Sequence, residues 1–307
     1  MDLVDKINDI GNGFNFNKDF VLKSCLILSD FKNIAFKVDN FKKQNMLTIE
    51  ENWDNISKAL ISAIELLSSY GYDRSSLAAN NLVIPIAYYL LKKGVPNDFP
   101  LKFKYADDRK KLHKWLNICQ LKRTFGGQSD NVLRSMREIL LKNHSSFPLE
   151  EIVQKLKGTS KSLVFDEDEI ENLLFYHYGQ PYTFSTLALL YPTLDFKNQF
   201  HIDHIFPKSF FTRPKLTKRG IEDINFYMDN FNYLANLQLL EGPINEEKSN
   251  IDFKEWLELD YPNKEERKDY MKKHFIPDVD LDFENFKEFI IKREEILLNE
   301  FKSILKL

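Results

Sequence analysis

The sequence predicts a mainly α-helical protein that carries a small strand-containing module in its second half. Apolar residues recur at helical spacing over most of the first 195 residues, and helical spacing returns toward the C-terminus. Between these parts, β-branched and aromatic residues bunch near residues 196–207. The 307 residues, of which 43% are apolar, are enough for more than one compact unit of ordinary globular composition.

The first part of the chain is predicted to form successive helices. Asn17 suits the cap of one helix, and Thr48 with Glu51 has capping-box spacing at the start of another that Gly71 ends. A third helix carries Pro85 in its first turn. Further helices are expected in residues 107–123, 131–143, 148–157, 166–179 and 183–191.

Beyond residue 196 the expected order is strand, loop, strand and helix. Residues 196–207 and 231–242 are the two strands, a polar and basic loop joins them, and Asp252 caps a later helix. We therefore divide the chain into four segments. These are an N-terminal helical region (1–97), a second helical region (98–195), the strand-containing module (196–260) and a C-terminal helical segment (261–307).

Composition excludes several classes of protein. The formal charge of −3 gives no global signal for a polyanionic partner. Cys25 and Cys119 belong to no CxxC pair, which argues against a disulfide scaffold and a cysteine zinc site. The start of the chain lacks the pattern of a signal peptide, and its longest apolar run falls short of the roughly 20 residues of a membrane helix. We expect a cytoplasmic protein with no membrane contact.

Polar residues that can do chemistry gather in FHIDHIFPKS, residues 200–209. On a strand His201 and Asp203 share one face and His204 takes the other, while Pro207 ends the strand. An Asp–His pair at a strand end can direct both side chains toward one cleft. The second strand supplies Asn236.

The helix after the second strand supplies Asn245 and Lys248, which share one helical face at their i, i+3 spacing. Carboxylate and amide oxygens are ligands that hard divalent cations prefer. Histidine can accept a proton from water near neutral pH, and a lysine can steady charge on a phosphoryl oxygen. The set indicates metal-assisted hydrolysis of a phosphodiester.

These motifs resemble the ββα-metal (His-Me finger, HNH) nuclease signature, with DHIFP, then NL at Asn236, then Asn245 nine residues later. The resemblance implies that His204 is the general base, that Asp203 and Asn245 hold Mg²⁺ or Mn²⁺, and that Asn236 braces the loop of the base. Lys248 would stabilise charge. The expected fold class is a helical domain with an embedded ββα-metal module at residues 196–260.

The chain also resembles GmrSD-type DNA restriction endonucleases over nearly its whole length. FNKDFVLKSCLILSD, IEENWDNISKAL, NNLVIPIAYYLLKKG, FGGQSD and FHIDHIFPKS occur in the family's order. The resemblance implies the C-terminal HNH half of such an enzyme, acting on DNA in antiviral defence. The family's nucleotide-dependent N-terminal half is missing here, so we expect it as a partner chain or as a lost part.

Several residues near the module have less definite roles. His201 could face the metal, contact phosphate or cap the strand, and a supporting role is favoured. Asn230, Asn232 and Ser209 are interpreted as turn or loop residues. The basic residues between the strands are predicted to contact DNA phosphates; they are Lys208, Arg213, Lys215, Lys218 and Arg219.

The leading hypothesis is a metal-dependent DNA endonuclease or nickase that restricts foreign or modified DNA. The alternative from another class is a catalytically inactive, HNH-fold DNA-binding or regulatory subunit, which would bind DNA in an EDTA-indifferent way. A third hypothesis is an RNase that uses the same site. The sequence does not determine DNA specificity, the number of strands cut or the oligomeric state.

Overall fold

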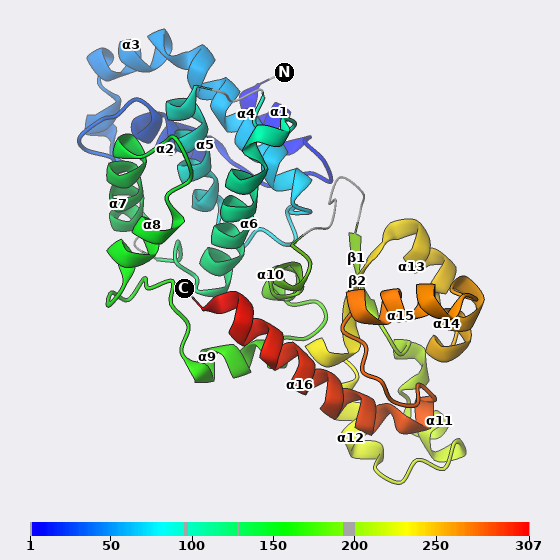
Figure 1. The fold of residues 1–307 in the computed structure, drawn as a ribbon. Coiled ribbons are helices and arrows are strands. Elements are labelled where there is room, and N and C mark those ends of the chain that lie inside the picture. Colours follow the sequence, from blue (N-terminus) through cyan, green and yellow to red (C-terminus); the bar gives the residue numbers. More distant parts are fainter. Residues whose placement is uncertain (1, 95–97, 128, 193–199, 307) are drawn as a thin grey trace. The chain divides into compact units, whose positions relative to one another are not determined.

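A computed structural model describes residues 2–94, 98–127, 129–192 and 200–306, and these are mainly helical with one two-stranded sheet (Figure 1). The mainly helical class predicted from the sequence is thus confirmed. None of the described helices combines the length and the apolar run that a membrane span requires.

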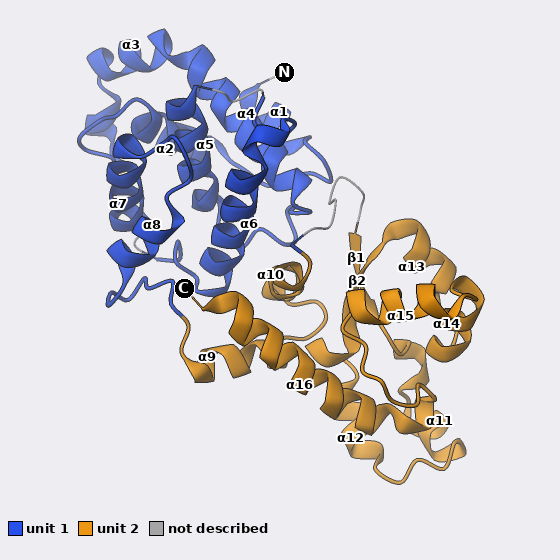
Figure 2. Cartoon of the chain, in the orientation of Figure 1, with its two compact units in different colours: residues 1–164, 192–197, 307 blue, residues 165–191, 198–306 orange. Residues whose placement is uncertain are grey.

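The chain divides into two compact units (Figure 2). Unit 1 is Met1–Val164 with the short segments Pro192–Lys197 and Leu307, and unit 2 is Phe165–Tyr191 with Asn198–Lys306. The limits predicted at 97/98 and 195/196 fall at or within residues outside the described ranges. The four-segment division therefore stays a prediction.

The described helices of unit 1 are α1 (Leu3–Asn8), α2 (Lys18–Leu28), α3 (Lys43–Glu51), α4 (Trp53–Ser69), α5 (Val83–Lys93), α6 (Ala106–Leu121), α7 (Ser129–Lys142) and α8 (Leu149–Leu156). Asn17 caps α2, as predicted, by accepting a hydrogen bond from the backbone N–H of Phe20. Gly94 ends α5 in the left-handed conformation, φ 69°, which costs glycine little.

The predicted helix start at Thr48 is wrong. Thr48 and Glu51 lie inside α3, and the Thr48 hydroxyl donates to the carbonyl of Gln44 within that helix. The helix is interrupted at Asn52, and α4 begins at Trp53. A side chain that bonds back into its own helix cannot also cap the next one, so the capping-box spacing was misleading here.

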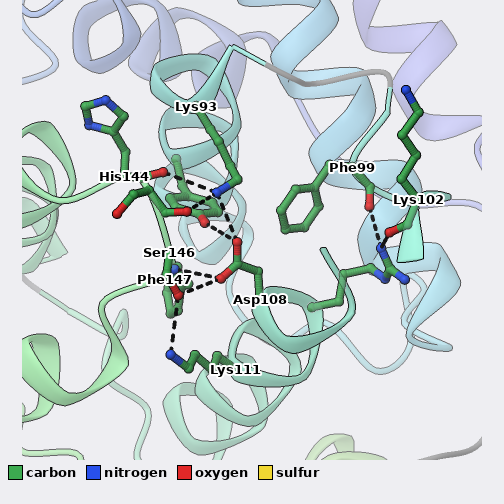
Figure 3. A network of polar contacts seen from close by, with 11 residues as sticks. Lys93, Phe99, Lys102, Asp108, Lys111, His144, Ser146 and Phe147 are labelled. Carbon is green, nitrogen blue, oxygen red and sulfur yellow. Dashed lines mark hydrogen bonds and ion pairs between the residues drawn. The ribbon is translucent and has the colours of Figure 1, made fainter. Parts of the chain in front are cut away.

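The carboxylate of Asp108 on α6 connects α6 with α5 and with the segment before α8 (Figure 3). From α5, Tyr89 donates to it at 2.8 Å and Lys93 pairs with it at 3.1 Å. The Ser146 hydroxyl and the Phe147 N–H donate at 2.8 and 3.0 Å. Burial raises the pKa of Asp108, but these hydrogen bonds outweigh it and hold the pKa below its usual value.

The described elements of unit 2 are α9 (Glu167–Asn172), α10 (Pro181–Leu190), β1 (Phe200–His204), α11 (Arg213–Lys218), α12 (Ile224–Asn230), β2 (Leu237–Glu241), α13 (Gly242–Lys248), α14 (Phe253–Asp260), α15 (Lys264–Lys273) and α16 (Phe286–Leu305). Both strands lie within the predicted ranges, and α13, α14 and α16 lie where helices were predicted. The prediction that the second strand supplies Asn236 is wrong, because β2 begins six residues after the predicted start and Asn236 ends a 3-10 turn, Leu234–Asn236, before it. The segment between the strands, expected to be a loop, contains the short helices α11 and α12.

β1 and β2 pair antiparallel, with Asp203 opposite Gln238 and His204 opposite Leu237. The chain continues from β2 directly into α13, which packs on both strands. The core of unit 2 includes Ile205 and Phe206, the two residues that follow β1. There the ring of Phe206 contacts Phe289 of α16, with ring centroids 4.9 Å apart. Burying such aromatic rings anchors the loop that follows His204.

Candidate active site

Asn236 holds the loop that follows β1. Its side-chain oxygen accepts from the backbone N–H of Phe206 at 3.0 Å, and its amide nitrogen donates to the carbonyls of Phe206 at 3.1 Å and Phe231 at 2.8 Å. Its own carbonyl accepts from Ile205 at 2.8 Å. Because Asn236 is fully buried, each of these bonds satisfies a group that water cannot reach. Asn236 thus fixes the backbone of Ile205 and Phe206 relative to the segment that precedes β2.

Asn245 and Lys248 lie on one face of α13, as their spacing predicted, and both contact β1. The Asn245 amide lies 3.3 Å from His201 Nδ1. The ammonium of Lys248 lies 3.2 and 3.0 Å from the two carboxylate oxygens of Asp203, and it donates to the carbonyl of His204 at 2.6 Å. Lys248 thus links α13 to the last two residues of β1.

The Asp203–Lys248 pair is buried. The Lys248 side chain is 0% exposed and that of Asp203 is 9% exposed. Burial lowers the pKa of Lys248, and the adjacent carboxylate opposes the shift. On the other side Gln238 donates to Asp203 at 2.9 Å and accepts from the Tyr270 hydroxyl at 2.7 Å. The carboxylate therefore lies within a connected polar network.

His204 lies in a separate pocket of side chains. Its Nε2 is 2.8 Å from Oδ1 of Asn232, and its ring lies 4.7 Å from the ring of Tyr178 and 6.3 Å from that of Phe231. Burial lowers the pKa of His204, although the bond to Asn232 and the charge of Asp203 act in the opposite direction. A lowered pKa keeps the imidazole neutral, which is the form that accepts a proton.

The sequence-predicted residues are thus brought together in two groups. Asp203 lies with Lys248 under α13, and Asn245 lies with His201 on the same side of β1. His204 instead faces the segment that contains Asn232. The roles assigned to these residues from the sequence remain predictions, because proximity alone does not establish them.

The donor set suits a hard cation. A carboxylate, a backbone carbonyl and an amide side chain are the oxygen donors that Mg²⁺ and Ca²⁺ take. The ammonium held by the Asp203 carboxylate and the His204 carbonyl shows that this position already favours a positive charge. Within the described ranges no three His, Cys, Asp or Glu side chains form a metal-binding group. Any metal would therefore depend on Asp203, amide or carbonyl oxygens, and solvent.

The basic residues predicted to contact DNA lie on and around α11 and are all exposed; they are Lys208, Arg213, Lys215, Lys218 and Arg219. Three of them line one groove together with Phe210; they are Lys215, Lys218 and Arg219. Arg219 also forms an ion pair with Glu284 at 2.8 Å. The grouping fits a positively charged surface on unit 2, and its contact with DNA stays a prediction.

Sequence reasoning missed several residues that support the site. Arg293 of α16 is fully buried and donates to the carbonyls of Ala235 at 2.7 Å and His274 at 3.1 Å. Asn232 and Tyr178 contact His204, although Asn232 was interpreted as a loop residue. Strand register would have pointed to Gln238, since it lies opposite Asp203. Nothing in the local sequence marks Tyr178 or Arg293.

Comparison with known families places this unit in a class of nucleases. Residues 150–300 match the family model of the GmrSD restriction endonucleases, C-terminal domain. The part of the chain that contains the sheet, α13 and the candidate site belongs to that family, as its motifs predicted. A comparison with curated proteins gave no match. The domain is therefore of the restriction endonuclease type.

Proposed function

We propose that this protein is a metal-dependent HNH-type endonuclease that hydrolyses phosphodiester bonds of DNA, by cutting or nicking, in the restriction of foreign or modified DNA. One observation supports this most directly. His204 and Asp203 end a strand whose following loop is braced by Asn236, and α13 places Asn245 and Lys248 over the same strand. This combination of residues on β1, its following loop and α13 supports the HNH-type assignment.

In the proposed reaction, His204 accepts a proton from a water molecule as that water attacks the scissile phosphorus in line. The bond between phosphorus and the 3′-oxygen breaks, and the products are a 5′-phosphate and a 3′-hydroxyl. The neutral imidazole, favoured by the lowered pKa of His204, is the competent form of the base. Asn236 holds the backbone of the loop after His204 through its hydrogen bonds with Phe206 and Phe231.

Asp203 and Asn245 would hold Mg²⁺ or Mn²⁺, which supplies charge stabilisation at the leaving oxygen. Lys248 would add positive charge near the phosphate, for which its ammonium must leave the buried contact with Asp203. His201 would support Asn245, which it contacts. The basic residues around α11 would contact phosphates along the DNA backbone.

A plasmid assay tests the function. Supercoiled DNA, with and without modified bases, is incubated with the protein and Mg²⁺, Mn²⁺ or EDTA. We expect open circles or linear DNA with either metal and none with EDTA. His204→Ala should abolish cleavage, while His144→Ala in unit 1 serves as the matched histidine control. Cleavage by His204→Ala at the wild-type rate would refute the assignment.

The competing function is a catalytically inactive DNA-binding or regulatory subunit. The exposed basic residues around α11 are the feature that favours it. It predicts DNA binding that weakens with salt, is indifferent to EDTA and produces no strand breaks with any divalent metal. Binding and cleavage measured on the same preparation separate the two functions. An RNA substrate in the same assay tests the RNase hypothesis.

A further inference from the structure

Two segments that are distant in sequence enclose the imidazole of His204. The first contains Tyr178, which precedes α10, and the second contains Asn232, which follows α12. The Tyr178 N–H donates to the carbonyl of Asn232 at 2.9 Å, and His177 and Tyr233 form a β-bridge beside it. The two segments are therefore held together by backbone hydrogen bonds. Each also contributes side-chain contacts to His204, from Tyr178 in the first segment and from Phe231 and Asn232 in the second.

These side chains restrain different degrees of freedom of the ring. Asn232 Oδ1 lies 2.8 Å from Nε2 of His204. An amide oxygen can only accept, so the hydrogen bond requires that Nε2 carries the proton. The Tyr178 ring lies 4.7 Å from the imidazole at an interplanar angle of 36°, and it limits rotation of the imidazole about its bond to Cβ.

We propose that Asn232 is a positioning residue that holds His204 as the Nε2–H tautomer, which leaves Nδ1 as the atom that accepts the proton, and that Tyr178 holds the ring in plane for this task. This inference rests on the proposed function only in taking His204 as the base. The orientation of the ring itself stands on the contacts of Asn232 and Tyr178.

The choice of tautomer determines which nitrogen can act. In the other neutral tautomer Nδ1 carries the proton and cannot accept one from water. Two acceptors, Nε2 and Asn232 Oδ1, would then face each other at 2.8 Å. Removing the Asn232 oxygen lets both tautomers and other ring rotations form. The loss should appear in the rate of cleavage and not in DNA affinity.

Substitutions at Asn232 separate the acceptor from the shape of the side chain. Asn232→Leu has nearly the same shape without an acceptor, and we expect the single-turnover nicking rate to fall by about 10- to 100-fold, part of the 10²–10⁴ that a general base contributes. Asn232→Asp keeps an oxygen acceptor, and its rate should stay within about threefold of wild type. The rates are compared near pH 8, because a carboxylate favours the imidazolium at lower pH.

The neighbouring Asn230 is the matched control, since its amide bonds the carbonyl of Phe226 at 2.7 Å in α12. Asn230→Leu should retain the wild-type nicking rate and DNA affinity. Tyr178→Phe keeps the ring and should also retain activity, whereas Tyr178→Ala should lose rate with unchanged DNA affinity. Circular dichroism and thermal melting confirm that each variant folds.

A spectroscopic readout is independent of cleavage. In ¹⁵N NMR of the histidine side chains, with the His204 signals identified by His204→Gln, wild type should show a protonated Nε2 and an unprotonated Nδ1. Asn232→Leu should show a mixture of tautomers. If wild type shows the Nδ1–H tautomer, or if Asn232→Asp is as slow as Asn232→Leu while folded, the inference is refuted. If no variant cleaves DNA, the NMR result still decides the orientation, while the proposed function fails.

Discussion

The buried pair of Asp203 and Lys248 gives the sharpest stability prediction. Lys248→Met keeps the length of the side chain and removes its charge, which leaves the carboxylate of Asp203 buried with Gln238 as its remaining donor. Breaking a buried pair by removing one partner costs about 3–5 kcal/mol. The hydrogen bond to the His204 carbonyl is lost as well, at about 1 kcal/mol. We expect unit 2 to be destabilised by about 4–6 kcal/mol.

The double variant Asp203→Asn/Lys248→Met supplies the comparison. An asparagine can still accept from Gln238, so no charge remains buried, and the double variant should cost only about 1–2 kcal/mol relative to wild type. Asp203→Asn alone leaves the ammonium unpaired and should cost about 3 kcal/mol. This non-additivity is the signature of direct coupling between the two groups.

The assay is urea denaturation followed by tryptophan fluorescence. Trp256 is buried in unit 2, so replacing Trp53 and Trp115 by Phe makes the signal specific to that unit. In the wild type, Lys248 neutralises the carboxylate of Asp203, the proposed metal ligand. The Lys248→Met variant leaves that carboxylate unpaired, so Mn²⁺ should stabilise the variant more than the wild type. The reasoning is refuted if Lys248→Met costs less than about 1 kcal/mol, or if the double variant costs as much as the sum of the singles.

Three further predictions concern other buried polar groups. Asn236→Ala leaves the buried N–H of Phe206 without its acceptor and should destabilise unit 2 by about 2–4 kcal/mol in the same denaturation assay, with Asn230→Ala as the near-neutral control. Burial lowers the pKa of His274 to about 3 from 6.5, so the unfolded state binds the proton first as the pH falls. The contribution of His274 to the free energy of unfolding should be fully present above about pH 6.5 and should decline by about 1.4 kcal/mol per pH unit toward pH 3. The His274→Gln variant should lack this part of the decline. In unit 1, Asp108→Ala removes the acceptor shared by α5 and the segment before α8. Followed in a variant that keeps Trp115 and carries Phe at positions 53 and 256, it should lower the stability by about 3 kcal/mol or more, and a loss below about 1 kcal/mol would contradict the role of this carboxylate.

Much of the fold could be predicted because local rules governed it. The cap at Asn17 and the apolar runs of α4 and α5 act within a few residues, and the structure has helices where those signals predicted them. The start of α4 could not be predicted, since the Thr48 hydroxyl had two competing uses and bonded inside α3. A spacing rule cannot decide between such alternatives.

The sequence by itself determined which residue types stand at the strand end and on α13, and from their spacing that Asn245 and Lys248 share a face. This relation follows from the period of the helix. Only the tertiary structure decided what each side chain contacts. Lys248 is paired with Asp203 because α13 folds back over β1. His204 meets Asn232 and Tyr178 because backbone hydrogen bonds bring together segments separated by more than 50 residues. Contacts of that kind depend on long-range packing, which local periodicity does not encode.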